Sequence, residues 1–366
     1  MNSKAHHRKE KIAWLVLLCC LLLTVLATSF PVFIERVYAN GIYPHIASAM
    51  RLVFGWIPFS VGDLLIGLLI LYVIRSLYRG IVKIRRKQWH WKSALFSSRK
   101  ILFAVLSVYV MFHVLWGFNY YRLGSAHLLK IQPEEYSNAD VDSLLQTLNH
   151  KLGELNKDSA GILQHQSKKR SELLQDAMSA YNAGTSQFSF LQFNHASLKP
   201  NALGPLQSYT GYSGYLFPFT AEAQVNFNAP TYTLPFTVCH EMAHQLGFGS
   251  ESEANMIGFL ACRSSTNIAF VYSAYADMHG YALHEMWKRD SVRAKQLNKE
   301  VPAILKQHRK EFAIWAKQHE SFMQPVLNYV YQHYLYSTNQ PQGLQSYNRV
   351  VAWLIAYAKK YGWAKI

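Results

Sequence analysis

The 366-residue sequence is poor in cysteine and in charged residues. Four cysteines in a chain of this length exclude a scaffold held together by disulfide bonds. Charged residues make up 16% and hydrophobic residues 50% of the chain, which excludes disorder over most of its length. Acidic residues are the scarcer kind, 21 against 37 lysines and arginines, so the formal net charge is +16.

The positive charge is concentrated in the N-terminal third. Residues 1–118 hold 15 basic and 3 acidic side chains, a net charge of +12, whereas residues 119–366 hold 22 and 18, a net charge of +4. A nucleic-acid-binding domain would carry its excess charge on a folded surface. The uneven distribution therefore argues against nucleic acid as a partner.

Three apolar segments of the N-terminal third are long enough to cross a membrane as helices. They lie at about residues 12–34, 56–76 and 101–121, and a spanning helix needs roughly 20 such residues. Because the first segment follows a basic N-terminus, a cleaved signal peptide is the alternative interpretation, but the two later segments favour a membrane span. The third segment ends in an aromatic cluster, residues 116–121, typical of a membrane–water boundary.

Asp63 is the one acidic or basic residue in residues 52–74, around the second apolar segment. An acid inside a membrane suggests a functional role such as proton transfer. Ser60 and Asp63, however, have the spacing of a helix cap, which favours a helix that begins at Ser60 with Asp63 at its positive end. We therefore expect Asp63 to lie at the membrane boundary.

The loop between the second and third spans fixes the expected orientation. Residues 75–100 include nine lysines and arginines and no acid. The positive-inside rule places this loop and the N-terminus in the cytoplasm. The sequence therefore predicts a membrane domain over residues 1–121 in the lipid bilayer of a cell membrane, followed by an extracytoplasmic domain over residues 122–366.

The C-terminal part has the pattern of a mainly α domain with a small β-sheet. Apolar residues recur at helical spacing in residues 139–155 and 171–181, and further helices are expected at 302–318, 321–336 and 345–361. Residues 215–227 have the composition of a loop plus a short strand. The last helix is too short and too charged for a fourth span.

A zinc-binding motif lies in the middle of this domain. The sequence His240-Glu241-Met242-Ala243-His244 has the form H-E-x-x-H. On a helix, two histidines four residues apart lie on one face and can bind one Zn²⁺, while the glutamate reaches a water held by the metal. Pro235 suits the first turn of such a helix, and Gly247 can end it in the left-handed conformation.

A catalytic zinc site also needs a third protein ligand and one open position. Glu251 and Glu253 follow the motif across a glycine-rich turn that can fold a second helix back against the first. We expect Glu253 to be the third ligand, with Glu251 as the alternative. Ser250 and Glu253 also have the spacing of a capping box, which by itself would explain an acid at position 253.

The expected chemistry is hydrolysis with Glu241 as the general base and one Zn²⁺ ion as the cofactor. A strand within residues 215–227 is expected to lie beside the zinc and to bind a peptide along its edge. Glu222 either contacts the substrate or points outward from that strand. Candidates for substrate contacts or for the oxyanion donor, which the sequence does not rank, are Tyr272, Tyr275, His279 and His284.

Two cysteines, Cys239 and Cys262, flank the motif. Two buried free thiols are the commonest outcome for such residues. The alternatives are a disulfide that joins the two motif helices and, for Cys239, a role as metal ligand.

The motif region resembles the zincin metallopeptidases. Glu253-Ala254-Asn255 is similar to the E-A-N that follows H-E-L-G-H in the peptidases that cleave phage-type repressors. Gly247 falls where metzincins have a glycine, but Ser250 stands in place of their third histidine, which argues against a metzincin.

Most of the chain resembles an uncharacterised family of bacterial multi-pass membrane proteins that carry H-E-M-A-H-Q-L-G. This resemblance implies a zinc-dependent hydrolase of the envelope with a zincin-like domain, and it names no substrate. The residues that carry it are Tyr212-Ser213-Gly214-Tyr215, Pro218-Phe219-Thr220, Glu222-Ala223-Gln224-Val225-Asn226 and residues 234–262.

The sequence leaves three classes of function open. The first is a membrane-anchored zinc metallopeptidase that acts on a peptide or protein outside the cytoplasm. The second is a zinc hydrolase for a non-peptide envelope substrate, which the same ligands would serve. The third is a non-catalytic assembly or interaction protein whose zinc is structural or absent.

Overall fold

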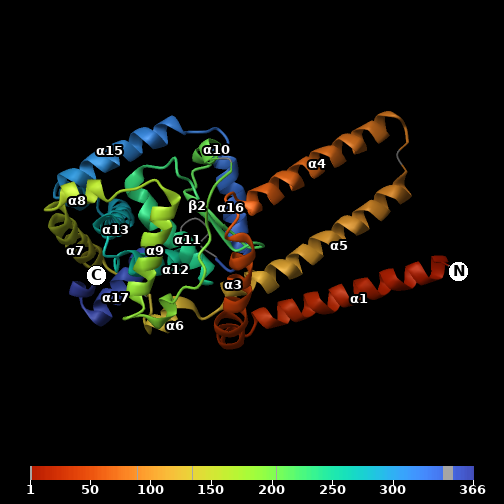
Figure 1. The fold of residues 1–366 in the computed structure, drawn as a ribbon, viewed down its shortest axis with the longest axis horizontal. Coiled ribbons are helices and arrows are strands. Elements are labelled where there is room, and N and C mark those ends of the chain that lie inside the picture. The colour runs from red at the N-terminus through yellow and green to blue at the C-terminus, as the bar shows by residue number, and fades with distance from the viewer. Residues whose placement is uncertain (1, 89, 134, 203, 341–348) are drawn as a thin grey trace.

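Three long helices project side by side from one face of a helical domain (Figure 1). They are α1 (Asn2–Thr28), α4 (Val61–Arg85) and α5 (Trp91–Leu115) in a computed structural model that describes residues 2–88, 90–133, 135–202, 204–340 and 349–366. Within these helices, Arg8–Thr28, Val61–Arg85 and Ser97–Leu115 are long and apolar enough to cross a membrane. Their leucine, isoleucine and valine side chains are largely exposed, as contact with lipid requires.

The three predicted apolar helices are confirmed, but their bounds differ from the prediction. The second covers Val61–Arg85 instead of residues 56–76. The first helix ends at Thr28 rather than at residue 34, since Pro31 begins the short helix α2 (Pro31–Phe33). The third ends at Leu115, and the aromatic cluster that follows forms the 3₁₀ helix η2 (Gly117–Tyr121). The predicted membrane–water belt at residues 116–121 is therefore packed in part against protein: Trp116 is 4% exposed.

The second span begins where the capping pattern predicted. Ser60 is the N-cap of α4, and its Oγ accepts a hydrogen bond from the backbone N–H of Asp63 at 2.9 Å. The carboxylate of Asp63 accepts hydrogen bonds from the backbone N–H of Ala202 at 2.6 Å and from the hydroxyl of Tyr215. Asp63 thus joins the first turn of the span to the neighbouring domain.

A helical segment between the first and second spans packs against the domain. It contains α2, the π-helical η1 (Ile34–Ile42) and α3 (Tyr43–Phe54). Figure 1 shows α3 crossing the ends of the three long helices that lie next to the domain. Arg51 donates hydrogen bonds to the carbonyl oxygens of Asn194 and Gln245 at 2.9 and 3.0 Å. The membrane part and the C-terminal part therefore share side-chain contacts, and the division at residue 121 stays a prediction.

The C-terminal part is built from helices around one apolar core, as predicted. The expected helices at residues 139–155, 171–181, 302–318 and 321–336 are confirmed as α7, α9, α15 and α16, whereas the start of the one at 345–361 lies outside the described residues. The described helices are α6 (Gly124–Leu129), α7 (Asn138–Asn156), α8 (Ser159–Gln164), α9 (Arg170–Gly184), η3 (Ser189–Leu191), α10 (Gly204–Ser208), η4 (Thr231–Thr233), α11 (Leu234–Gln245), α12 (Glu251–Cys262), α13 (Ile268–Arg289), α14 (Ser291–Lys299), α15 (Ala303–Gln318), α16 (Gln324–Ser337), α17 (Val350–Tyr361) and η6 (Trp363–Lys365).

A small three-stranded sheet packs against α11 and contributes Leu198, Ala223 and Val225 to the core. It has the strand order β1-β3-β2, with β1 (Leu198–Pro200) parallel and β2 (Gly214–Phe217) antiparallel to β3 (Glu222–Val225). The sequence predicted one short strand in residues 215–227, and the structure has the two strands of a hairpin. Within the described residues β2 is an edge strand, so one side of its backbone has no strand partner.

Candidate metal centre

The H-E-x-x-H motif lies on α11, which has the ends that the sequence predicted. Pro235 occupies the first turn, and Gly247 follows the helix with a φ of 87°. His240 and His244 share one face, and the centroids of their rings are 4.8 Å apart. Both side chains are buried, because α11 lies between the sheet and the helices α9, α12 and α13.

The second motif helix, α12, packs closely on α11. A Cβ atom at Gly258 would lie 3.0 Å from the backbone of His240, so a larger residue would force the two helices apart by a few tenths of an ångström. The close packing brings Glu251, the first residue of α12, to the two histidines. Its Oε2 atom lies 3.2 Å from Nε2 of His240 and 3.6 Å from Nε2 of His244.

These three ligand atoms have the arrangement of a metal site. They all lie within 4.8 Å of one another, and the three side chains are buried. In a tetrahedral zinc site with bonds of 2.0–2.1 Å, neighbouring ligand atoms are about 3.3 Å apart. Glu251 Oε2 has no hydrogen-bond partner among the described residues, although it is buried. A divalent cation would satisfy this oxygen, and two imidazoles with one carboxylate are a zinc-type donor set.

The structure assigns different positions to the two candidate third ligands. Glu253, which the sequence favoured, turns away from the histidines and accepts hydrogen bonds from the backbone N–H and the hydroxyl of Ser125 at 2.7 and 3.2 Å. Its backbone N–H donates to Ser250 Oγ at 3.4 Å, so Ser250 caps α12. The predicted capping box is present only in this half, because the carboxylate of Glu253 bonds to Ser125. The preference for Glu253 is therefore corrected in favour of Glu251, because residues two apart on a helix point to different sides.

Neighbouring groups orient the three side chains. Nδ1 of His244 lies 2.7 Å from the carbonyl oxygen of Phe248, which accepts its proton and leaves Nε2 free for a metal. The hydroxyl of Tyr331 on α16 donates to Glu251 Oε1 at 2.7 Å, so the other oxygen faces the histidines. The indole N–H of Trp116 donates to the carbonyl oxygen of His244 at 3.3 Å.

The metal-free cluster behaves as an ion pair. Burial lowers the pKa of His244, but the charge and hydrogen bond of Glu251, together with the charge of Glu241 and the carbonyl group of Phe248, raise this pKa to about 9. Burial opposes ionisation of Glu251, and the imidazoles of His244 and His240 nevertheless hold its pKa well below the ordinary value. A cation that replaces the proton of His244 would thus enter a preformed site.

Glu241, the predicted general base, lies in the same pocket. Burial raises its pKa to about 7, an effect that the two histidines partly offset. A carboxyl with a pKa near neutrality suits a group that takes up and returns a proton. Gly214 on β2 lies against it, since a Cβ atom there would be 2.5 Å from Glu241 Oε1.

The pocket around these groups is small and mostly aromatic. Its volume is about 120 Å³. Part of the wall comes from β2 and Pro218, in the segment where the sequence placed a strand beside the zinc. The other parts, residues 116–120 and α16, lie far from the motif in the chain, and no local pattern pointed to them. Besides the motif residues and Glu251, the walls are formed by Trp116, Tyr120, Gly214, Tyr215, Leu216, Pro218, Tyr331 and Tyr334.

The other site residues suggested by the sequence lie outside this pocket. Glu222 is buried and accepts hydrogen bonds from the backbone N–H groups of Val61 and Gly62, at the positive end of α4, so it anchors the second span to the sheet. The hydroxyl of Tyr272 bonds to Nδ1 of His308, and that of Tyr275 donates to the carbonyl oxygen of Ile366. These side chains therefore have structural partners instead of the expected substrate or oxyanion contacts.

His279 is also a structural residue. Its Nε2 lies 2.9 Å from Asn149 Oδ1, and its Nδ1 lies 2.7 Å from Arg309. Burial, together with the charge of Arg309, lowers its pKa to about 3. His284 lies on the exposed side of the same helix.

Replacing His279 with Gln is expected to reduce the acid sensitivity of the fold. Unfolded His279 takes up a proton below its ordinary pKa of 6.5 and folded His279 does not, so the free energy of unfolding falls as the pH drops from about 6.5 towards 3. This group contributes a slope of up to about 1.4 kcal/mol per pH unit. Denaturation curves at several pH values give the slope of the free energy of unfolding against pH. This slope should be shallower for His279→Gln, and the control His284→Gln should match the wild type. Equal slopes for all three proteins would refute this role of His279.

Cys239 and Cys262 are buried free thiols, which was the favoured expectation. The Sγ atom of Cys262 donates to the carbonyl oxygen of Phe270 at 3.1 Å. Cys239 is not in the ligand cluster. The alternatives of a disulfide and of a cysteine ligand are therefore not supported.

Comparison with known proteins gives a family and no function. Residues 38–355 match a family model described as "Protein of unknown function (DUF3810)". No curated protein and no solved structure matches the chain.

Proposed function

Since the chain belongs to the DUF3810 family of proteins of unknown function, we propose its activity from its own residues: it is a membrane-anchored, zinc-dependent hydrolase that cleaves peptide bonds. The observation that carries this proposal is the buried cluster of His240, His244 and Glu251, with Glu241 in the same pocket. Three protein ligands and a neighbouring carboxyl of near-neutral pKa are typical of catalytic rather than structural zinc sites.

The proposed chemistry is hydrolysis. The zinc ion, when bound, supplies a Lewis acid for a substrate carbonyl and for a water molecule. Glu241 accepts a proton from that water and returns it to the leaving nitrogen. One C–O bond forms and one C–N bond breaks, so one water is consumed and the products are a carboxylic acid and an amine.

Neighbouring groups support the binding of an extended peptide. The edge strand β2 offers backbone groups to a peptide that adds as a further strand. Tyr334 and Tyr120, whose hydroxyls are 2.8 Å apart, line the metal pocket. We propose Tyr334 as the hydrogen-bond donor to the developing oxyanion, in place of the candidates on α13.

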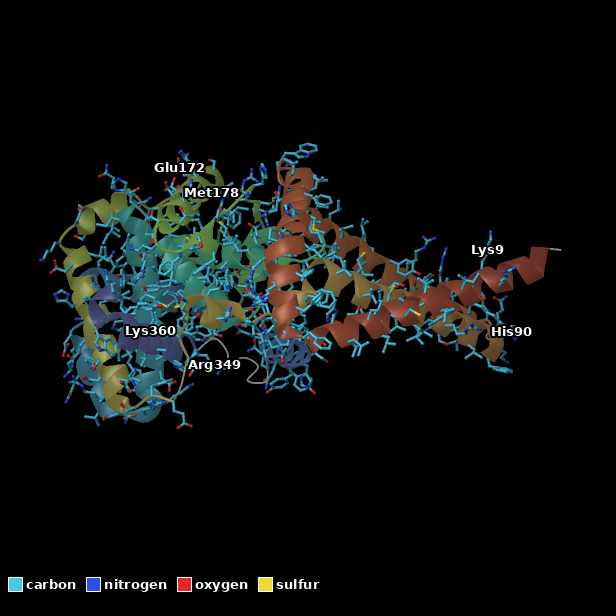
Figure 2. All side chains as sticks on the ribbon, turned by 90° about the horizontal axis from the view of Figure 1, so that it is seen from below. Lys9, His90, Glu172, Met178, Arg349 and Lys360 are labelled. Atoms are coloured by element: carbon cyan, nitrogen blue, oxygen red, sulfur yellow. The ribbon has the colours of Figure 1, made fainter. Side chains whose placement is uncertain are left out.

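The proposed location is the cell membrane, with the metal centre outside the cytoplasm. The N-terminal end of α1 and the basic turn between α4 and α5 lie at the same end of the spans, away from the domain (Figure 1). Figure 2 shows Lys9 and His90 at that end, far from Glu172 and Lys360 on the domain. This arrangement fits the positive-inside rule with that end in the cytoplasm.

Removal and return of zinc test the proposal. The full-length protein in detergent is stripped with a chelator and assayed against a mixed peptide library by mass spectrometry. We expect cleavage to disappear with the metal and to return when zinc is added in amounts equal to the protein. Cleavage that persists without metal, or the absence of any cleavage by the fully zinc-loaded protein, would contradict a zinc peptidase.

A further inference from the structure

A second cavity adjoins the metal pocket. It has a volume of about 830 Å³ and lies between α4, residues 201–202 and 207–212, β2 and α16. We call it the α4 groove. Gly214, Tyr215 and Tyr331 line both the α4 groove and the metal pocket, so the two spaces share part of their walls.

One wall of the α4 groove is a membrane-spanning helix. Leu64, Leu68 and Leu71 of α4 line it and are 51%, 54% and 63% exposed. The lining extends along α4 from Asp63 to Leu71, which is about 12 Å of helix. Because the hydrocarbon core of a bilayer is about 30 Å thick, the α4 groove reaches well into the depth of the lipid tails.

The lining of the α4 groove carries almost no charge. Asp63 is the only acidic or basic residue among the described residues that line it, and its carboxyl group already accepts hydrogen bonds from Ala202 and Tyr215. The remaining lining is mainly aliphatic and aromatic. Such a surface fits a hydrocarbon chain, whereas a charged headgroup would lose its hydration there without gaining a partner.

The space at the metal centre is small and closely packed. Gly214 has no side chain, and even a Cβ atom at this position would contact Glu241 Oε1 at 2.5 Å. The metal pocket, at about 120 Å³, has room for about four water molecules of roughly 30 Å³ each. An extended chain fits such a space, but an intact helix, which is about 10 Å wide, does not.

We propose that the substrate is an acylated peptide anchored in the bilayer, whose acyl chain lies in the α4 groove while its peptide part extends along β2 to the metal centre. This inference rests on the proposed hydrolase function for the cleavage step alone. The groove positions the substrate by its lipid anchor and so favours bonds close to the membrane surface. A transmembrane helix and a free lipid are the competing occupants.

Photolabelling tests the position of the acyl chain directly. The zinc-loaded full-length protein in phosphatidylcholine nanodiscs is exposed to a palmitoylated peptide that carries a diazirine in its acyl chain. We expect the label on α4 between residues 64 and 71 and on Leu327, and we expect unlabelled palmitoylated peptide to compete with it. Label spread equally over α1, α4 and α5, or displaced only by an unacylated transmembrane peptide or by phospholipid, would overturn the inference.

Two glycines of α4 provide matched variants. A Cβ atom at Gly67, in the α4 groove, or at Gly80, outside it, meets nothing within 4 Å, so a larger side chain starts in open space at either position. Gly67→Trp fills the α4 groove and is expected to reduce labelling and to raise the KM for the acylated peptide at least about tenfold, because a few methylene groups lose their apolar wall. Gly80→Trp is expected to behave as the wild type.

The outcomes separate this inference from the proposed function. If the acylated and unacylated peptides are cleaved with the same KM, or if Gly67→Trp labels as the wild type does, the α4 groove does not bind the acyl chain, although the peptidase stands. If the groove is labelled and neither peptide is cleaved, the peptidase fails and the acyl-chain site stands. The zinc content of Gly67→Trp shows whether this variant folds. If it does not fold, the positions labelled in the wild-type protein alone test whether the acyl chain lies in the α4 groove.

Discussion

Replacing Glu241 with Gln is expected to reduce kcat by a factor of about 10² to 10⁴, the usual contribution of a general base, while zinc stays bound. The amide has nearly the shape of the carboxyl and fits the same buried space beside Gly214, but it takes up no proton at neutral pH. None of the three ligand atoms belongs to Glu241, so the zinc content should stay at the wild-type level. The measurement is peptide hydrolysis together with metal analysis of the same sample.

The combination of the two readouts makes this test specific. A variant that loses both zinc and activity would show that Glu241 supports the site rather than acting on the water. Undiminished turnover with zinc bound would remove Glu241 as the base. Gln245 provides a control on the same helix, because its side chain bonds to the carbonyl oxygens of Ser197 and Ala221 and does not enter the metal pocket.

Replacing Glu251 with Ala is expected to weaken zinc binding by more than a factor of about 100, because the change removes a ligand. Loss of only a hydrogen bond to a ligand lowers metal affinity by roughly 10- to 100-fold. The matched control is Glu253→Ala, which removes a buried carboxylate two residues away on the same helix. It breaks the bonds to Ser125 and is expected to lower the free energy of unfolding by about 1–3 kcal/mol, with zinc affinity near the wild-type value.

Competition titrations with a chromophoric chelator measure these affinities. Tyr331→Phe should fall between the two glutamate variants, since it removes only the hydrogen bond that orients Glu251. The opposite order, with zinc lost from Glu253→Ala and kept by Glu251→Ala, would restore Glu253 as the third ligand and refute the assignment made from the structure.

Patterns local in the sequence predicted the features that depend on local structure. The four-residue spacing of His240 and His244 fixes their common face on any α-helix, so the pair could be found without a structure. The start of α4 at Ser60 followed from the cap, and the end of α11 followed from Gly247. The three spans followed from their length and apolar composition.

Features that depend on tertiary packing could not be predicted from the sequence. Glu251 and Glu253 lie in the same first turn of α12, and only the way α12 packs on α11 decides which one faces the histidines. Tyr331 lies about 80 residues further along the chain and reaches the site through α16. The aromatic residues at 116–121 have the composition of a membrane boundary, and the structure places Trp116 and Tyr120 of this cluster in the wall of the metal pocket.

The most direct test of the metal centre is the zinc content and coordination of the full-length protein. Metal analysis of wild-type protein equilibrated with zinc and freed of excess should give one ion per chain, and X-ray absorption should show two imidazole nitrogens with oxygen ligands at 2.0–2.2 Å. The double variant His240→Ala, His244→Ala should bind none. Equal zinc uptake by the wild type and the double variant, or a zinc ion surrounded by sulfur, would contradict the central claim.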